Sequence, residues 1–306
     1  MYHSIGNVPA ETDIFDLHVG PERFREQIEF LASHYEILPL SKLYHHARSG
    51  RPTPNSLALT FDDGYANNLS VAAPILREFQ APATLFLCTG FLGRDAYWWD
   101  HLAQIVLTAT HYPRKLAHIE FGFLGAERLL SENPALHGRR VQEREAGALK
   151  ELVLELWGGL RHLSLDRIYG LLRELDSLFV PDVDLSGVRP LRIEEVRLAA
   201  DVFTIGAHTV THPFLTAVDD QRLNAEISES RSMCKTLSGQ VVDCFSYPFG
   251  NVNPRVAAEV ALHMSLACTV QEGVVGSDTD PLKIPRIQIP AWTPDQLNSK
   301  LDDVMR

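Results

Sequence analysis

Residues 57–64, LALTFDDG, decide the fold: an apolar run over 57–61 ends abruptly at Asp62, Asp63 and Gly64. A short apolar run bounded by turn residues is typical of a buried strand. Two adjacent carboxylates at a strand end repel each other unless a cation or a proton lies between them. The stretch therefore predicts either a strand that leads into a metal or acid–base site or an ordinary acidic turn, because Asp and Gly also favour turns.

Helix-like and strand-like segments alternate on both sides of this stretch. Apolar residues at helical spacing predict helices over 21–34, 193–200 and 219–237, and short apolar runs predict strands over 84–88, 202–207, 244–247, 266–270 and 284–289. This rhythm predicts an α/β fold, a parallel sheet or (β/α) barrel with helices outside. Residues from about 94 to 190 are rich in Leu, Arg, Glu and His at helical spacing, which predicts a helical insertion.

Composition narrows the class of protein. The chain has 306 residues, is 45% hydrophobic and carries a formal net charge of −11, which argues against a nucleic-acid surface because such a surface needs a concentrated basic footprint. No run reaches the roughly 18 apolar residues of a membrane-spanning helix, and no basic leader opens the sequence, so we expect a cytoplasmic protein without a transmembrane segment. Cys88 and Cys268 lie in apolar runs and no CxxC pair occurs, which favours buried free thiols over disulfides. Oligomeric state is not indicated.

Two later segments carry candidate chemistry. Residues 206–213, GAHTVTHP, place His208 at a strand end and His212 four positions on; neutral imidazoles so spaced can ligate one ion, although 13 histidines make a chance pair easy to find. Residues 245–250, FSYPFG, end a strand in a turn whose backbone N–H is a suitable oxyanion donor or simply an ordinary strand exit. Since strand C-termini meet on one side of an α/β barrel, we expect these segments to share one active site.

Together, TFDDGY at 60–65, HTVTHP at 208–213 and SYPFG at 246–250 resemble the three main motifs of the polysaccharide deacetylase family, the NodB-homology carbohydrate esterases. The resemblance covers roughly residues 1–93 and 190–306 and leaves the helical block unaccounted for. It implies an α/β fold of the distorted (β/α) barrel type, as one catalytic domain over residues 1–306 with a helical insertion at about 94–190.

The resemblance also implies a mechanism. One divalent metal ion would be held by Asp63, His208 and His212; we expect Zn²⁺, while Co²⁺, Ni²⁺, Fe²⁺ and Mn²⁺ also suit such a site. Asp62 would be the catalytic base, and the backbone N–H of Phe249 would assist at the oxyanion. The enzyme would then remove N-acetyl groups from the amino sugars of a polysaccharide or glycan precursor.

The sequence departs from the family pattern twice. The late strand has no histidine to act as general acid, but Tyr2-His3 resembles an early YH motif of exopolysaccharide deacetylases that look circularly permuted, which makes His3 the expected acid. Ser246 stands where many members have an arginine that orients the catalytic aspartate. Arg286, near a later strand end, is the candidate to supply the missing charge.

Further expectations concern the substrate. Five residues are expected to contact it: Tyr65, Tyr247, Pro248, Trp98 and Trp99. Exposed aromatic side chains stack on sugar faces, and buried packing is the alternative for the two tryptophans. The motifs leave other functions open, namely deformylation, hydrolysis of a non-carbohydrate amide, and an inactive glycan-binding protein.

Overall fold

The structure is a computed structural model that describes residues 1–9, 12–50, 55–111, 113, 146–182 and 184–305. It divides into two compact units, which we describe separately. Unit 1 comprises Met1–Asn7, Asp16–Arg94 and Arg189–Arg306, and unit 2 comprises Val8–Phe15 and Asp95–Val188. Among the described residues, none of the helices has both the length and the apolar character needed to cross a membrane.

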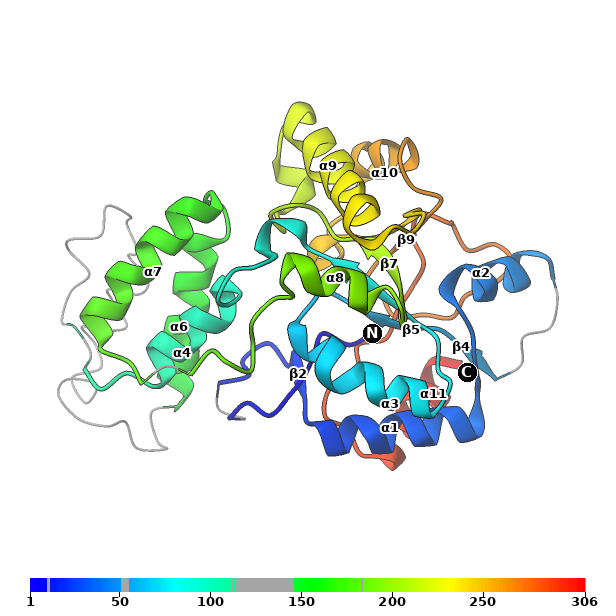
Figure 1. Cartoon of the computed structure of the whole chain (residues 1–306), viewed down its shortest axis with the longest axis horizontal. Coiled ribbons are helices and arrows are strands. Elements are labelled where there is room, and N and C mark those ends of the chain that lie inside the picture. The colour runs from blue at the N-terminus through cyan, green and yellow to red at the C-terminus, as the bar shows by residue number, and fades with distance from the viewer. Residues whose placement is uncertain (10–11, 51–54, 112, 114–145, 183, 306) are drawn as a thin grey trace. The chain divides into compact units, whose positions relative to one another are not determined.

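Unit 1 is built on a parallel sheet of five strands in the order β5-β6-β7-β8-β9 (Figure 1). The strands are β5 (Leu59–Phe61), β6 (Ala83–Leu87), β7 (Phe203–Ala207), β8 (Cys244–Ser246) and β9 (Leu266–Cys268). All but one of their residues are buried, as expected for parallel strands that are covered on both faces. The apolar run that we predicted over 57–61 is divided between β4 (Ser56–Leu57) and β5.

Backbone hydrogen bonds connect the two edges of this sheet into a ring. At the β5 edge, Tyr2 pairs in parallel with Phe61, and its N–H donates to the Thr60 carbonyl at 2.8 Å. At the β9 edge, Ile284 forms a parallel bridge with Cys268. The backbone of Met1 joins these two segments, because it donates to the Ile287 carbonyl at 2.7 Å and accepts from the Ile289 N–H at 3.0 Å. The predicted distorted (β/α) barrel is therefore confirmed.

The late segment at 284–289 differs from prediction. We expected a strand, but the segment makes one bridge, at Ile284, and no regular ladder is assigned to it. Pro285 follows immediately, and a proline has no N–H to donate to a ladder. The segment nevertheless fills its place in the ring through irregular hydrogen bonds.

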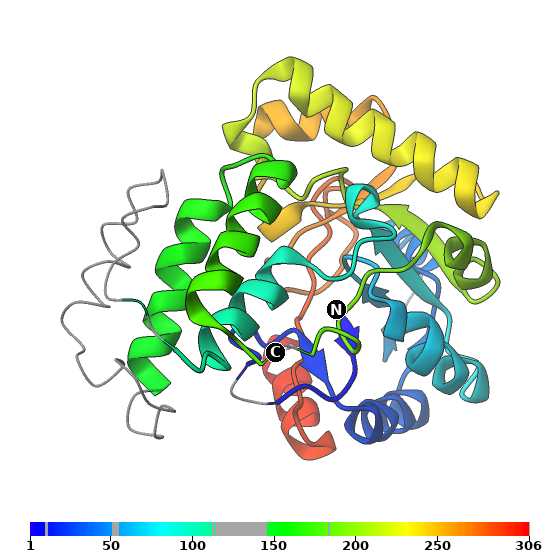
Figure 2. The same cartoon turned by 60° about the vertical axis from the view of Figure 1, so that its left-hand side comes forward.

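Helices lie outside the strands of unit 1 (Figures 1 and 2). They are α1 (Pro21–His34), α2 (Leu40–Arg48), α3 (Ala73–Glu78), α8 (Ile193–Ala199), α9 (Asp220–Ser238), α10 (Pro254–Ala261) and α11 (Pro294–Met305). Local chemistry sets their ends: the Asp219 side chain caps α9 by accepting from the Arg222 N–H at 2.8 Å, and Gly239, at φ +71°, ends it.

Short elements complete unit 1. Two small parallel pairs join β1 (Ser4–Ile5) to β2 (His18–Val19) and β3 (Glu36–Ile37) to β4. One turn each is formed by the π-helix η1 (Asn68–Ala72) and the 3₁₀ helices η2 (Thr89–Phe91), η5 (Leu215–Ala217) and η6 (Pro248–Gly250).

An aromatic cluster fixes the strand that carries the two aspartates. Phe61 is fully buried and its ring lies 5.4 Å from Tyr2, 5.9 Å from Phe24 and 5.5 Å from Phe203, measured between centroids. Each buried aromatic side chain of this size contributes about 1.5–3 kcal/mol by leaving water. Packing from three directions therefore holds Phe61, and the residues that follow it, in a defined position.

Unit 2 contains the helices α4 (Trp98–Leu107), α6 (Ala146–Leu160) and α7 (Leu165–Phe179). The predicted insertion at 94–190 falls largely in this unit, but its residues 112, 114–145 and 183 lie outside the described residues. Trp98 and Trp99 are only 3% and 5% exposed, and Trp98 stacks on Trp157. Their burial favours packing over the substrate contact that we expected, because an aromatic ring must be exposed to stack on a sugar.

Candidate metal centre and active site

The candidate site lies where strands of the barrel end. Asp62 and Asp63 directly follow β5, His208 follows β7, and the turn η6 begins two residues after β8. These strands are parallel and β7 is hydrogen-bonded to both β6 and β8, so their C-terminal ends meet at one end of the barrel. The sequence motifs, far apart in the chain, are thus brought together by the strand order.

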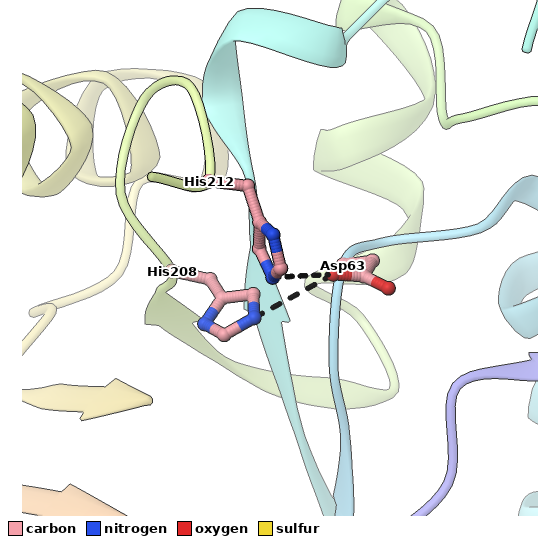
Figure 3. Close-up of side chains that lie close together, drawn as sticks. All are labelled: Asp63, His208 and His212. Carbon is pink, nitrogen blue, oxygen red and sulfur yellow. Dashed lines mark ion pairs between the residues drawn. The ribbon is translucent and has the colours of Figure 1, made fainter. Parts of the chain in front are cut away.

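Asp63, His208 and His212 converge (Figure 3). Asp63 Oδ1 lies 3.5 Å from His208 Nε2 and 3.6 Å from His212 Nε2. One ligand atom from each residue lies within 4.8 Å of the others. Asp63 and His212 both adopt left-handed backbone, at φ +71° and +56°, a conformation that costs non-glycine residues energy and that tends to occur at functional sites.

The tautomer of His208 and the neutral state of both imidazoles suit them to bind a metal ion. His208 Nδ1 lies 2.7 Å from the Ser246 carbonyl oxygen; because a carbonyl can only accept, Nδ1 carries the proton and Nε2 presents its lone pair towards Asp63. Burial lowers the pKa of both His208 and His212, so both rings are neutral at pH 7. One carboxylate oxygen and two neutral imidazole nitrogens fit a divalent first-row metal ion.

Asp62 is held by a buried arginine. Arg286 Nη1 donates to Asp62 Oδ1 at 2.7 Å and Arg286 Nη2 to Oδ2 at 2.7 Å, a bidentate pair in which both side chains are nearly inaccessible. Burial alone would raise the pKa of Asp62, but the Arg286 guanidinium outweighs it and the pKa is lowered. The expectation that Arg286 supplies the missing charge is confirmed by these contacts.

Ser246 connects this ion pair to the metal centre. Its hydroxyl donates to Asp62 Oδ2 at 2.9 Å and accepts from Arg286 Nη2 at 2.8 Å, while its carbonyl fixes His208. Arg286 also donates through Nε to the Thr269 carbonyl at 2.9 Å. One residue therefore links the candidate base, the guanidinium and a metal ligand.

His3 lies in the segment that pairs with β5. The Asp62 N–H donates to the Tyr2 carbonyl at 3.0 Å, which places the YH motif alongside the aspartates. Sequence reasoning missed the two asparagines that anchor this segment: Asn68 Nδ2 donates to the His3 carbonyl at 2.8 Å, and Asn67 Oδ1 accepts from the Ile5 N–H at 3.0 Å. Their only sequence signal is that they follow TFDDGY after a single residue, Ala66.

The His3 side chain is half-buried. Burial lowers its pKa, against the opposing effect of the Asp62 carboxylate, so the ring is neutral at pH 7. Its role as general acid rests on the YH motif and on this position, and it stays a prediction.

Phe249 flanks the metal centre. It lies in η6 with left-handed backbone at φ +57°, and its ring centroid is 4.5 Å from that of His212 and 4.3 Å from that of Phe214. Gly250, at φ +64°, permits the tight turn, since a Cβ there would lie 2.4 Å from Val270 Cγ2. The expected oxyanion role of the Phe249 N–H stays a prediction.

The remaining expected substrate contacts are buried. Tyr65 and Tyr247 are both 0% exposed, and Pro248 is buried within η6. These residues lie close to the ends of β5 and β8, and their side chains offer no exposed face to a substrate. Their expected role in substrate binding stays a prediction. The expectation for the cysteines holds: all four are free and buried.

The sequence pattern of the family described as "Polysaccharide deacetylase" matches residues 49–111 and 193–265. These two segments carry both aspartates and both histidines of the site, and they flank the predicted insertion. Over these residues the chain is similar to the polysaccharide deacetylase family.

A relative of known activity is similar to part of the chain. A poly-beta-1,6-N-acetyl-D-glucosamine N-deacetylase of Staphylococcus aureus is 30% identical over 89 residues, which are 29% of this chain. The matched part spans about a third of that relative, 31% of its length.

Solved structures share the fold. A Streptococcus pyogenes deacetylase, PplD, solved in complex with acetate, aligns at a TM-score of 0.60 with 19% identity and covers 98% of this chain and 95% of its own. IcaB from Ammonifex degensii aligns at a TM-score of 0.57 with 15% identity over 97% of this chain and 93% of its own. At these identities the likeness establishes the deacetylase fold and nothing finer.

Proposed function

We propose that this protein is a metal-dependent hydrolase that removes N-acetyl groups from amino sugars of a glycan. The observation that carries the proposal is the pairing of a three-ligand metal centre with an adjacent carboxylate held ionised. Asp63, His208 and His212 offer the ligands, and Asp62 is fixed by Arg286 rather than by the metal ligands. A ligand carboxylate beside a separate base carboxylate is the arrangement that metal-assisted hydrolysis requires.

A divalent ion bound at this centre would polarise the acetyl carbonyl and lower the pKa of a water molecule. Asp62 then takes the proton of the attacking water. A carboxylate oxygen offers about two lone pairs; Oδ2 accepts from both Arg286 and Ser246, whereas Oδ1 accepts from Arg286 Nη1. Oδ1 is therefore the oxygen that keeps capacity for the proton.

The water oxygen bonds to the acetyl carbon, and the carbon–nitrogen bond then breaks. The products are acetate and a free amine, and the departing nitrogen needs a proton. His3 is proposed to deliver it; because the ring is neutral at rest, His3 must first take up a proton, and the proton that Asp62 removes from the attacking water is its proposed source. The Phe249 N–H is proposed to stabilise the charge that develops on the carbonyl oxygen.

The metal and the substrate class belong to the proposal as well. We propose Zn²⁺, although this donor set also suits Co²⁺, Ni²⁺, Fe²⁺ or Mn²⁺. The substrate is proposed to be an exopolysaccharide or its precursor rather than chitin. Two features support this: the early Tyr2-His3 motif and the partial similarity to a poly-beta-1,6-N-acetyl-D-glucosamine N-deacetylase.

The test is acetate release from β-1,6-linked N-acetylglucosamine oligomers by the metal-loaded protein. Asp62→Asn should lower the rate about 10²–10⁴-fold, as expected for loss of a general base, with the metal still bound, and His3→Ala should also lose activity. Asp303→Asn and His45→Ala, at exposed positions, are matched controls and should release acetate at the wild-type rate.

Other outcomes would redirect the proposal. Full activity in His3→Ala would leave the acid unassigned. Release of formate or of another acid in place of acetate would indicate a different amide hydrolase. Absence of any release, with oligosaccharide still bound, would indicate a glycan-binding protein.

A further inference from the structure

A buried acidic residue of α9 contacts the loop that carries both histidines. Glu226 is 5% exposed. Its Oε2 accepts from the Val210 N–H at 2.9 Å and from the Thr211 N–H at 2.8 Å, and its Oε1 accepts from the Thr211 hydroxyl. Arg222, one turn earlier on the helix, lies 3.6 Å away through Nε. The carboxylate is thus bound to the middle of the segment between His208 and His212.

The loop of residues 209–212 adopts an unfavourable backbone conformation. Thr209 and His212 both adopt left-handed backbone, at φ +70° and +56°, a conformation that non-glycine residues do not favour. An internal bond from the His212 N–H to Thr209 Oγ1, at 3.0 Å, supports it. The loop must still turn sharply enough for two rings four residues apart to approach one Asp63 oxygen.

Contacts from two other elements fix the peptide groups of the loop. Glu226 binds the Val210 N–H, and the Gly90 N–H donates to the Val210 carbonyl at 2.7 Å. A side chain at position 90 would clash, since its Cβ would lie 2.5 Å from that carbonyl oxygen. The N–H and the carbonyl of Val210 are therefore both held, the N–H by a charge-assisted hydrogen bond, which is stronger than a neutral one.

Helix stability alone does not explain a glutamate here. A buried carboxylate is costly unless it is hydrogen-bonded or paired, and the acceptor bonds of Glu226 described here go to the loop, not to its own helix. An apolar residue would pack against the barrel at lower cost. What the carboxylate adds is a rigid connection between α9 and the backbone next to His212.

We infer that Glu226 is a positioning residue of the metal centre, which presets the 209–212 loop so that His208 and His212 meet Asp63 before an ion binds. The inference rests on the metal centre of the proposed function. It does not depend on which substrate is cleaved. Glu226 touches neither the ligand nitrogens nor the candidate base in the contacts described, and it acts through the backbone of Val210 and Thr211.

The test is metal binding itself, with Co²⁺ and Zn²⁺ as probes and the whole chain as the protein. Affinity is measured by competition with a chromophoric chelator, and the coordination of Co²⁺ by its visible absorption spectrum. The variants are Glu226→Ala and the isosteric Glu226→Gln, with Thr211→Val and Thr211→Ser to test the hydroxyl contact. Glu229→Gln, an exposed position on the same helix, changes the charge equally and serves as the matched control.

Loss of partners that orient metal ligands typically weakens binding about 10–100-fold, so Glu226→Ala should weaken Co²⁺ binding at least about tenfold and alter the spectrum. Glu226→Gln, which keeps one acceptor oxygen, should fall between Glu226→Ala and the wild type. Thr211→Ser should bind as the wild type does and Thr211→Val more weakly. The thermal midpoint of metal-free Glu226→Gln should stay near that of Glu229→Gln.

Wild-type affinity and spectrum in Glu226→Gln and in Thr211→Val would overturn the inference. So would a fall in the thermal midpoint of Glu226→Gln with unchanged Co²⁺ binding, because that result describes a merely structural residue. If Glu226→Ala does not fold, Glu226→Gln and the Thr211 pair decide. The experiment uses no substrate and measures metal binding alone. A failure of the deacetylase proposal can therefore be distinguished from a failure of this inference.

Discussion

Replacing Arg286 by glutamine should convert Asp62 from a stabilising group into a destabilising one. In the native protein the guanidinium makes two 2.7 Å bonds to the carboxylate. It also contacts Ser246 and the Thr269 carbonyl. Glutamine cannot reproduce the charge or the bidentate geometry, so the variant leaves a buried carboxylate without its counter-charge.

The magnitude follows from the burial of the pair. Removing one partner of a buried ion pair typically costs about 3–5 kcal/mol of unfolding free energy, and the value should apply in full at pH 7–8, where Asp62 is ionised in the wild type. The cost should shrink at lower pH. Without Arg286, burial raises the pKa of Asp62. At lower pH the carboxylate of the variant therefore takes up a proton, which removes the cost of a buried, unpaired charge.

The wild type and the variant should respond to pH in opposite directions. In the wild type the pKa of Asp62 is lowered in the folded state, so its contribution is present above the ordinary carboxyl pKa and is lost only as the pH falls through the lowered value. In Arg286→Gln the folded pKa is the higher one, and the stability of the variant should fall as the pH rises through it. The gap between the two proteins should therefore widen from pH 5 to pH 8.

Urea unfolding at pH 5, 6.5 and 8 measures the gap. Arg25→Gln is the matched control, because Arg25 makes the same kind of bidentate contact to Glu78 but both side chains are exposed; exposed pairs contribute little, so its effect should be small at every pH. An Arg286→Gln protein as stable as Arg25→Gln, or a gap that does not change with pH, would refute the reasoning.

Three further predictions concern Ser246, Asn68 and the four cysteines. Ser246→Ala removes the hydroxyl between Asp62 and Arg286 and should cost about 1 kcal/mol of unfolding free energy, measured by urea unfolding, while the metal affinity stays at the wild-type value. Asn68→Ala removes the bond to the His3 carbonyl and should lower kcat for acetate release more than it raises KM. Because Asn68 acts through His3, the His3→Ala, Asn68→Ala double variant should be no slower than His3→Ala alone, and additive losses would contradict this role. The thiols should not react with Ellman's reagent at pH 8 in the native protein, because all are buried and burial raises the pKa of Cys268 to about 11; all four should react in denaturant, and a thiol that reacts rapidly in the native protein would contradict this burial.

The barrel and the convergence of Asp63, His208 and His212 could be predicted because their signals are local. Short apolar runs that end in Asp62-Asp63 and in His208 carry both the strand and the ligand in one stretch of sequence. Parallel strands then bring these ends together without further information. The early Tyr2-His3 motif made His3 a candidate for the site, but the pairing of Tyr2 with the β5 edge was not predicted.

Other features depend on contacts that sequence spacing does not reveal. Glu226 is one of several acidic residues on α9, and only its burial against Val210 and Thr211 distinguishes it. Trp98 and Trp99 have the composition of a sugar-binding face, but helix packing in unit 2 buries them. The segment at 284–289 is apolar enough for a strand, yet Pro285 interrupts its hydrogen bonding.

The most direct test of the central claim is a metal titration of the chelator-treated protein, followed by acetate release from β-1,6-linked N-acetylglucosamine oligomers. We predict that activity is lost on chelation and returns with added Zn²⁺ or Co²⁺ to a plateau at a single ion per chain. A His208→Ala, His212→Ala double variant, assayed beside it, should neither bind the ion at that stoichiometry nor recover. Full acetate release by the metal-free protein, or recovery in the double variant, would contradict a metal centre formed by Asp63, His208 and His212.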